Sequence, residues 1–91
     1  MFAWDEPKRL LNRARHGVDF AEINLFDWAS AVTRADTRAA YGEQRFISVG
    51  PISDRLHVCV WTLRDGRNRV ISLRKANSRE GELYVQAQKL H

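Results

Sequence analysis

The residues best suited to chemistry in this chain are the arginines of its second half. Of the 15 basic residues, 12 are Arg and three are Lys. Residues 55–91 carry a net charge of +5, whereas residues 1–54 carry a net charge of −1. A guanidinium group presents a planar fork that matches the geometry of a phosphate. The basic half therefore indicates nucleic acid or an acidic protein as a partner, or arginines that only solvate the edge of a sheet.

Six basic residues crowd the predicted last hairpin and the start of the last helix: Arg64, Arg67, Arg69, Arg74, Lys75 and Arg79. We expect Arg64 and Arg74 to converge at the end of the sheet near Ser78. There they would form an anion pocket beside the N-terminus of a helix, where backbone N–H groups and the helix dipole favour negative charge.

Three further side chains could transfer protons: His16, Glu43 and Tyr84. Together with the arginines they could cut RNA without a metal ion. A base would take the proton of the 2′-hydroxyl, arginines would stabilise the charged phosphorus centre, and an acid would protonate the leaving oxygen. The same residues are compatible with plain RNA binding, or with an ionic network that only stabilises the fold.

Other kinds of site have no signature in the sequence. It contains no Gly-rich phosphate loop, no His-Glu-x-x-His and no set of residues spaced as zinc ligands. Cys59 is the only cysteine and lies between Val58 and Val60 in a predicted strand, where a thiol is typically a small buried apolar group. We therefore expect no metal, no cofactor and no nucleophilic cysteine.

Length and composition indicate one small globular domain. The chain has 91 residues, of which 44% are apolar, and this suits a single thin core. No apolar run approaches the roughly 18 residues that a transmembrane helix needs. The first residues lack the order of a signal peptide. We expect one domain spanning residues 1–91, located in the cytoplasm.

Helix signals mark both ends of the chain. The first helix is predicted over residues 5–16, with Asp5 as its N-cap and a glycine after its last residue. A second helix is predicted to follow Asp19, which can form a capping box with Glu22. Its expected apolar stripe consists of Ala21, Leu25, Trp28 and Ala29, widened by Ile23 and Phe26. The last helix is predicted to begin at Ser78 as N-cap.

Between the helices the apolar period changes to two, which is the period of a β-strand. Strands are predicted over residues 45–49, 55–64 and 69–75, with a fourth around residues 31–36. Turns are predicted at Gly50-Pro51 and Asp65-Gly66, so that consecutive strands pair antiparallel. Simple alternation would put Val70, Ser72 and Arg74 on one face of the last strand, and Arg69, Ile71, Leu73 and Lys75 on the other. Two helices, three or four antiparallel strands and a final helix make an α+β domain.

Short motifs in a fixed order extend over nearly the whole chain. They begin with Phe2-x-Trp4-Asp5-x-x-Lys8 and Asn12-x-x-Arg15-His16-Gly17-Val18-x-Phe20. They continue with Gly42-Glu43-x-Arg45-Phe46, Gly50, Thr62-x-Arg64 and Arg69-Val70-Ile71-Ser72-Leu73-Arg74-Lys75-Ala76, and they end with Arg79-Glu80 and Tyr84. With these motifs the chain resembles the BrnT toxins of bacterial type II toxin–antitoxin systems.

The resemblance implies a RelE-like toxin fold with two N-terminal helices, an antiparallel sheet and a C-terminal helix. It implies an endoribonuclease that arrests translation and growth and is neutralised by a cognate antitoxin, BrnA. Two toxins and two antitoxins would form a heterotetramer that contacts operator DNA only through the ribbon-helix-helix part of the antitoxin. The alternative is a non-catalytic module, derived from such a toxin, that only binds an antitoxin or RNA.

The resemblance also implies roles for the candidate residues. The predicted catalytic residues are His16, Glu43, Arg64, Arg74 and Tyr84. The predicted RNA-binding residues are Arg64, Arg69, Arg74, Lys75 and Arg79. Each proton carrier also has a structural explanation, because His16 could stabilise a helix C-terminus as a cation, Glu43 could pair with an arginine, and the ring of Tyr84 could pack against the sheet.

Overall fold

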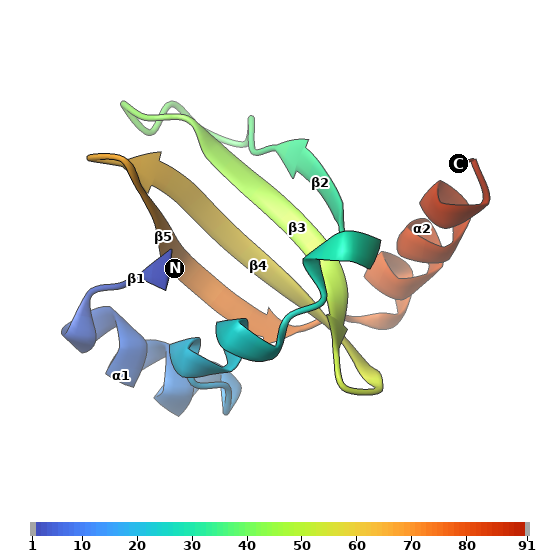
Figure 1. Ribbon diagram of the computed structural model, residues 1–91, viewed down its shortest axis with the longest axis horizontal. Helices are drawn as coiled ribbons and strands as arrows, with labels where there is room; N and C mark the ends of the chain where they lie inside the picture. Colours follow the sequence, from blue (N-terminus) through green and yellow to red (C-terminus); the bar gives the residue numbers. More distant parts are fainter. Residues whose placement is uncertain (1, 91) are drawn as a thin grey trace.

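A five-stranded sheet in the order β1-β5-β4-β3-β2 forms the centre of the computed structural model, which describes residues 2–90. The strands are β1 (Phe2–Ala3), β2 (Val32–Ala35), β3 (Arg45–Ile52), β4 (Arg55–Arg64) and β5 (Arg67–Lys75). The α-helices are α1 (Glu6–His16) and α2 (Ser78–Lys89), and two short 3₁₀ helices are η1 (Phe20–Leu25) and η2 (Trp28–Ser30). Figure 1 shows α1 and η1 together along one face of the sheet, with α2 apart from them beside β2 and β3.

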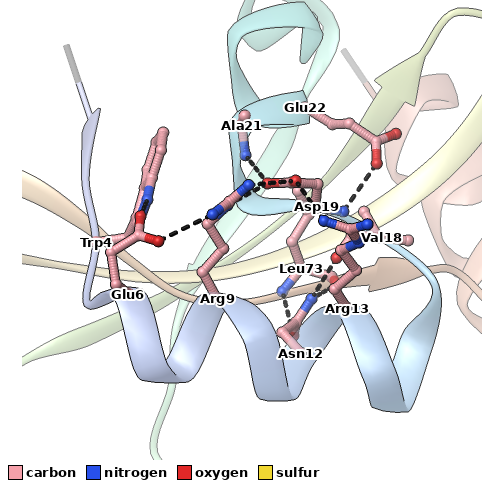
Figure 2. Close-up of polar contacts among 10 residues, drawn as sticks. All are labelled: Trp4, Glu6, Arg9, Asn12, Arg13, Val18, Asp19, Ala21, Glu22 and Leu73. Atoms are coloured by element: carbon pink, nitrogen blue, oxygen red, sulfur yellow. Dashed lines mark hydrogen bonds and ion pairs between the residues drawn. The ribbon is translucent and has the colours of Figure 1, made fainter.

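Helix α1 begins and ends where the sequence predicts. The Asp5 side chain accepts a hydrogen bond from the backbone N of Lys8 (3.1 Å), and Gly17 has a φ of 70°, the left-handed conformation of a helix C-cap. Arg9 then joins α1 to the next segment, because its Nε and Nη2 donate to both carboxylate oxygens of Asp19 at 2.9 and 3.0 Å (Figure 2). This fork lowers the pKa of Asp19 to about 2.

The buried side chain of Asn12 fixes α1 to the edge of β5. Its Nδ2 donates to the carbonyls of Val18 (3.0 Å) and Leu73 (2.7 Å), and its Oδ1 accepts from the backbone N of Leu73 (3.3 Å) (Figure 2). The amide thus makes the two bonds to Leu73 that a neighbouring strand would make. No polar atom of this contact is left without a partner.

The predicted second α-helix is wrong, because the segment forms η1 and η2 instead. The capping box between Asp19 and Glu22 is confirmed. The expected stripe is not buried: Ala21 is exposed and Leu25 is 66% exposed. The buried side chains are instead spaced three residues apart: Phe20, Ile23 and Phe26. A 3₁₀ helix has three residues per turn, so this spacing brings all of them to the side that faces the sheet.

Strand β3 is longer than predicted. The expected turn at Gly50-Pro51 is wrong, since the strand continues to Ile52 and the chain turns at Ser53-Asp54. Strand β2 pairs with β3 only as far as Val49. On the other side, Pro51 faces Leu56 of β4, next to the pair Ile52–Arg55 that closes the hairpin. The pair beside a hydrogen-bonded closing pair is not itself hydrogen-bonded, so β4 does not need the backbone N–H that Pro51 lacks, and a proline is tolerated there.

Gly50 is required where β3 passes under the buried ring of Phe26. A Cβ at this position would lie 2.9 Å from Cζ of Phe26 and 3.2 Å from Cβ of Ala31. We expect Gly50→Ala to lower the free energy of unfolding by about 1–3 kcal/mol, measured by urea denaturation. The matched control is Gly81→Ala in α2, where the added Cβ meets only Cδ1 of Leu56 at 3.9 Å. Gly81→Ala should raise the free energy of unfolding by up to about 1 kcal/mol, because alanine favours a helix more than glycine does. Equal effects of the two substitutions would contradict the prediction.

The sheet contains one strand that no sequence pattern predicts. Strand β1 has two residues, too few to show a period, and it pairs in parallel with β5. The sheet is therefore mixed and five-stranded, which corrects the expectation of three or four antiparallel strands.

The α+β class is confirmed, and so are the strand over residues 55–64 and the turn at Asp65-Gly66. Both turn residues have positive φ values, as a type I′ turn requires.

A β-bulge in β5 decides which of its side chains share a face. The pairing with β4 shifts between Val60 and Trp61, so that Ile71 is an extra residue of β5. The predicted simple alternation is therefore wrong, since Val70 and Leu73 both face the core under α1. The opposite face of β5 carries Arg69, Ser72 and Arg74.

Apolar side chains cover the two faces of the sheet unequally. The larger cluster lies under α1 and η1 and consists of Val18, Phe20, Ile23, Phe26, Ile52, Cys59, Val70 and Leu73. The smaller cluster, on the opposite face, consists of Ile47, Val58 and Ala76. Helix α2 has no buried residue and lies beside β2 and β3. This second face is therefore only partly covered, and we call it the open face.

Candidate active site

The open face of the sheet holds a pocket of about 160 Å³. It is lined by Arg34, Arg38, Arg45, Ile47, Val58, Val60, Ile71, Ser72, Arg74 and Glu80. We call it the arginine pocket. Four guanidinium groups and one carboxylate give it a positive charge, and the apolar side chains of the strands form its floor. Low polarity under the arginines strengthens their attraction for an anion, so the pocket is suited to phosphate.

Arg74 is held in the pocket by the start of α2. Its Nη1 and Nη2 donate to the two carboxylate oxygens of Glu80 at 2.8 and 2.7 Å. Glu80 also accepts a bond from the backbone N of Asn77 (2.9 Å), which is the N-cap of α2 in place of the predicted Ser78. The bond from Arg74 lowers the pKa of Glu80, so this carboxylate is charged at neutral pH. A phosphate would compete with it for the same guanidinium fork.

Two further arginines of the pocket are oriented by the loop between β2 and β3. The Nε and Nη2 of Arg38 donate to the fully buried carboxylate of Asp36 at 2.7 and 2.8 Å, and this bond holds the pKa of Asp36 well below its usual range. The guanidinium carbon of Arg45 lies 4.1 Å from the centroid of the Tyr41 ring, a cation–π contact. Arg34 on β2 is exposed and makes no ion pair within residues 2–90.

Arg64 and Glu43 lie at the other end of the sheet. The Nε and Nη2 of Arg64 donate to Glu43 at 2.9 to 3.1 Å, and Nε of Arg45 contacts the same carboxylate at 3.4 Å. The bonds from Arg64, more than those from Arg45, lower the pKa of Glu43. Arg74 is paired with Val58 of β4. Val58 lies six residues before Arg64, which is about 20 Å along the strand. The expected convergence of Arg64 and Arg74 near Ser78 is therefore wrong.

His16 is the proton carrier that lies next to the arginine pocket. It lines a hollow of about 170 Å³ together with Ile71 and Ser72, which also line the arginine pocket. Partial burial lowers the pKa of His16, and the positive charges of Arg15 and Arg74 lower it further. The imidazole is therefore neutral at pH 7 and can accept a proton.

The other predicted site residues lie outside the arginine pocket. The hydroxyl of Tyr84 donates to the carbonyl of Ser30 at 2.7 Å, which engages its proton in a structural bond. Arg69 lies half-buried on the open face, beside the hairpin that joins β4 and β5. Lys75 and Arg79 are exposed, the first at the end of β5 and the second in the first turn of α2.

Sequence reasoning missed the arginines that come from the first half of the chain. Alternation in the predicted strand 45–49 could have placed Arg45 on the same face as Ile47. Nothing in the local pattern identifies Arg38, because it lies in a loop and is oriented by the buried carboxylate of Asp36. The pocket depends on the pairing of distant strands, which a single sequence does not show.

The described part of the chain holds no cluster of metal ligands, no reactive thiol and no helix that could span a membrane. Within residues 2–90, no three His, Cys, Asp or Glu side chains come together as the ligands of a metal ion would. Burial raises the pKa of the Cys59 thiol to about 12, so a thiolate does not form near neutral pH. No helix among these residues is long and apolar enough to cross a membrane.

Comparison with known families agrees with this geometry. The model of the family described as "Ribonuclease toxin, BrnT, of type II toxin-antitoxin system" matches residues 4–80. The chain belongs to the BrnT family. It is thus related to toxins of type II toxin–antitoxin systems, a class defined by an antitoxin partner, and the BrnT family is described as one of ribonucleases. No curated protein matches the chain.

The matched region contains the whole candidate site. Residues 4–80 include α1 with His16, strands β2 to β5 and every residue of the arginine pocket, of which Glu80 is the last along the chain. Tyr84 lies beyond the BrnT match. The match therefore includes both residues of the Arg74–Glu80 ion pair.

Proposed function

We propose that this BrnT-family chain is an endoribonuclease toxin that binds RNA phosphate in the arginine pocket and uses His16 as its general base. The observation that carries the proposal is that four arginines line one pocket and that His16 lines a neighbouring hollow, which shares Ile71 and Ser72 with this pocket. The lowered pKa of His16 supports its role as a base. Arginines can supply the charge stabilisation that a metal ion would otherwise provide.

The proposed reaction needs only the RNA, the residues of this site and a proton from solvent. His16 takes the proton of a 2′-hydroxyl, and the 2′-oxygen attacks the adjacent phosphorus. The bond from phosphorus to the 5′-oxygen breaks, and the leaving oxygen takes a proton from solvent. Arg34 and Arg74 stabilise the charge that builds up on the phosphoryl oxygens. The products are a 2′,3′-cyclic phosphate and a 5′-hydroxyl.

The remaining candidate residues take supporting roles in this proposal. Glu43 is ionised and orients Arg64, and Tyr84 anchors α2. RNA beyond the cleaved phosphate is bound by basic residues at several places on the protein surface: Arg64, Arg69, Lys75 and Arg79. Such contacts go to the phosphate backbone and make binding weaker as salt concentration rises.

The BrnT family match supports the biological role that we propose. We propose that the chain has a RelE-like toxin architecture, cuts RNA in the cytoplasm and thereby inhibits translation and growth. A BrnA-type antitoxin neutralises it in a heterotetramer of two toxins and two antitoxins. Operator DNA is bound through the antitoxin alone.

The direct test is incubation of the purified chain with an end-labelled RNA, with and without EDTA. We expect cleavage in both samples and products that end in a 2′,3′-cyclic phosphate. His16→Ala should lower the cleavage rate by about 10²- to 10⁴-fold, while Arg55→Ala, at an exposed position outside the pocket, should cleave like the wild type. RNA that stays intact with a folded wild-type protein would refute the ribonuclease function.

The pH dependence of cleavage reports on His16. Because its pKa is lowered, the free base predominates above a pH that lies below the usual value of about 6.5. The rate should therefore rise with pH in the acidic range and reach a plateau before neutrality. Arg15→Gln removes one of the charges that lower this pKa, so it should move the acidic limb to higher pH. If the acidic limb of the pH–rate profile of Arg15→Gln coincides with that of the wild type, another group is the base.

A second candidate function is suggested by the ion pairs of the pocket. Arg38, Arg45 and Arg74 each have a carboxylate partner in the free chain. Such a network could serve only to stabilise the fold, and the chain would then be a module that binds RNA or an antitoxin without cutting. In the cleavage assay, this alternative predicts binding that weakens steeply with salt and no new RNA ends.

A further inference from the structure

A second concave surface lies beside the arginine pocket, between α2 and strands β2 and β3. It has a volume of about 290 Å³ and is lined by Val32, Arg34, Ile47, Val49, Glu80, Leu83, Tyr84 and Ala87. We call it the α2 groove. Its walls are mainly aliphatic, and its charged residues lie where it meets the arginine pocket.

The α2 groove is open because polar contacts hold α2 in place. Glu80 bonds to β5 at the start of the helix, and the side chains of Tyr84 and Gln88 both donate to the carbonyl of Ser30, at 2.7 and 2.6 Å. Helix α2 has no buried residue, and Leu83 is 54% exposed. The helix is thus anchored while its apolar side chains remain available for a further contact.

The lining of the α2 groove is better suited to a peptide than to a nucleotide. Aliphatic walls offer little to a nucleotide, which is recognised by stacking on aromatic or guanidinium planes and by charge. The charged rim is formed by Arg34 and Glu80. Glu80 is paired with Arg74, whereas Arg34 is exposed and has no ion-pair partner within residues 2–90, so Arg34 is available to bind a carboxylate. We propose that the α2 groove docks an amphipathic segment of the antitoxin, with aliphatic side chains against Leu83 and Ala87 and a carboxylate on Arg34. This inference rests on the proposed function, because it takes the antitoxin as the partner.

Docking in the α2 groove would also explain neutralisation. Arg34, Ile47 and Glu80 line both the groove and the arginine pocket. A segment seated in the groove therefore covers one wall of the pocket and places its own negative charge beside the arginines. RNA phosphate and antitoxin carboxylate then compete for overlapping positions, and the toxin is inhibited by occlusion of its site.

The test compares two exposed leucines on opposite faces of the sheet. Leu83→Gln changes the α2 groove, and the matched control Leu10→Gln changes α1, where the side chain is 55% exposed. Each purified variant is titrated with the purified antitoxin, and its RNA cleavage is measured separately. We expect Leu83→Gln to weaken antitoxin binding by about 10-fold or more, because a polar amide enters an apolar contact, and to cleave RNA at the wild-type rate, because it adds no charge beside Arg34. Leu10→Gln should bind the antitoxin normally.

Three outcomes would overturn the docking surface: normal antitoxin binding by Leu83→Gln, equal weakening in Leu10→Gln, or loss of RNA binding in Leu83→Gln. A wild-type chain that dimerises through the groove, and becomes monomeric in Leu83→Gln, would also overturn it. A second variant, Ala87→Gln, repeats the test on the same wall. If the wild type cuts no RNA but Leu83→Gln still loses antitoxin binding, the ribonuclease function fails and the docking surface stands.

Discussion

Arg74→Ala is expected to lower the turnover number for RNA cleavage by about 10²- to 10³-fold, the usual cost of removing one group that stabilises a charged transition state. The guanidinium of Arg74 lies in the arginine pocket, beside the hollow that holds His16. Arg74→Lys should recover little of the activity, since an ammonium group cannot make the two parallel bonds of the guanidinium fork. The measurement is single-turnover cleavage of an end-labelled RNA at saturating enzyme.

Glu80→Gln separates a catalytic role of Arg74 from a structural one. If Arg74 served only to hold α2, removal of either partner of the ion pair would have the same effect. In the proposed function, phosphate displaces Glu80 from Arg74, so Glu80→Gln should keep or raise the cleavage rate and lower the KM. The glutamine oxygen can still accept the capping bond from Asn77. Equal losses in Arg74→Ala and Glu80→Gln would assign the pair to stability alone.

Asn12→Ala is expected to lower the free energy of unfolding by about 3 kcal/mol. The substitution leaves two buried carbonyls and one buried N–H without their partner, those of Val18 and Leu73, and each such group costs about 1–3 kcal/mol. Part of this cost is avoided in the variant if α1 shifts away from the sheet, because water can then bond to the exposed backbone groups. Urea denaturation followed by circular dichroism measures the change.

The control for this prediction is an exposed asparagine. Asn24→Ala in η1 should change the free energy of unfolding by less than about 0.5 kcal/mol. Asn12→Asp should destabilise the fold as well, because its carboxylate would face the carbonyls of Val18 and Leu73, to which the amide now donates. If Asn12→Ala and Asn24→Ala have similar effects, the Asn12 amide does not hold α1 to the sheet.

Local signals predicted the parts of the fold that local interactions determine. Helix α1 has its cap residues in the sequence, and β4 shows clear alternation followed by an Asp-Gly turn. The segment after Asp19 was predicted as an α-helix because its capping box suits both kinds of helix, while the three-residue spacing of Phe20, Ile23 and Phe26 favours the 3₁₀ form. Strand β1 exists only through pairing with β5, so no local pattern marks it.

The candidate site was predicted only in part. The arginines of the second half were recognised by charge, and Arg74 lies in the arginine pocket. Arg64 was expected beside it, but the register of β4 and β5 separates the two residues. Arg34 and Arg38 reach the pocket through strand pairing and a buried carboxylate, both of which depend on contacts between distant parts of the chain.

The extra residue in β5 couples the length of this strand to its bulge. Because Ile71 breaks the alternation, Arg69 and Arg74 face the same side of the sheet although five positions separate them. Deleting Ile71 itself would restore simple alternation and still leave Arg69, Ser72 and Arg74 on one face of the strand. Losing the bulge at unchanged length would instead turn either Arg69 or Arg74 into the core under α1, so a charged and an apolar position would have to be exchanged at the same time. Sequences descended from a common ancestor with this site should therefore either keep the bulge or lose it together with one residue of β5.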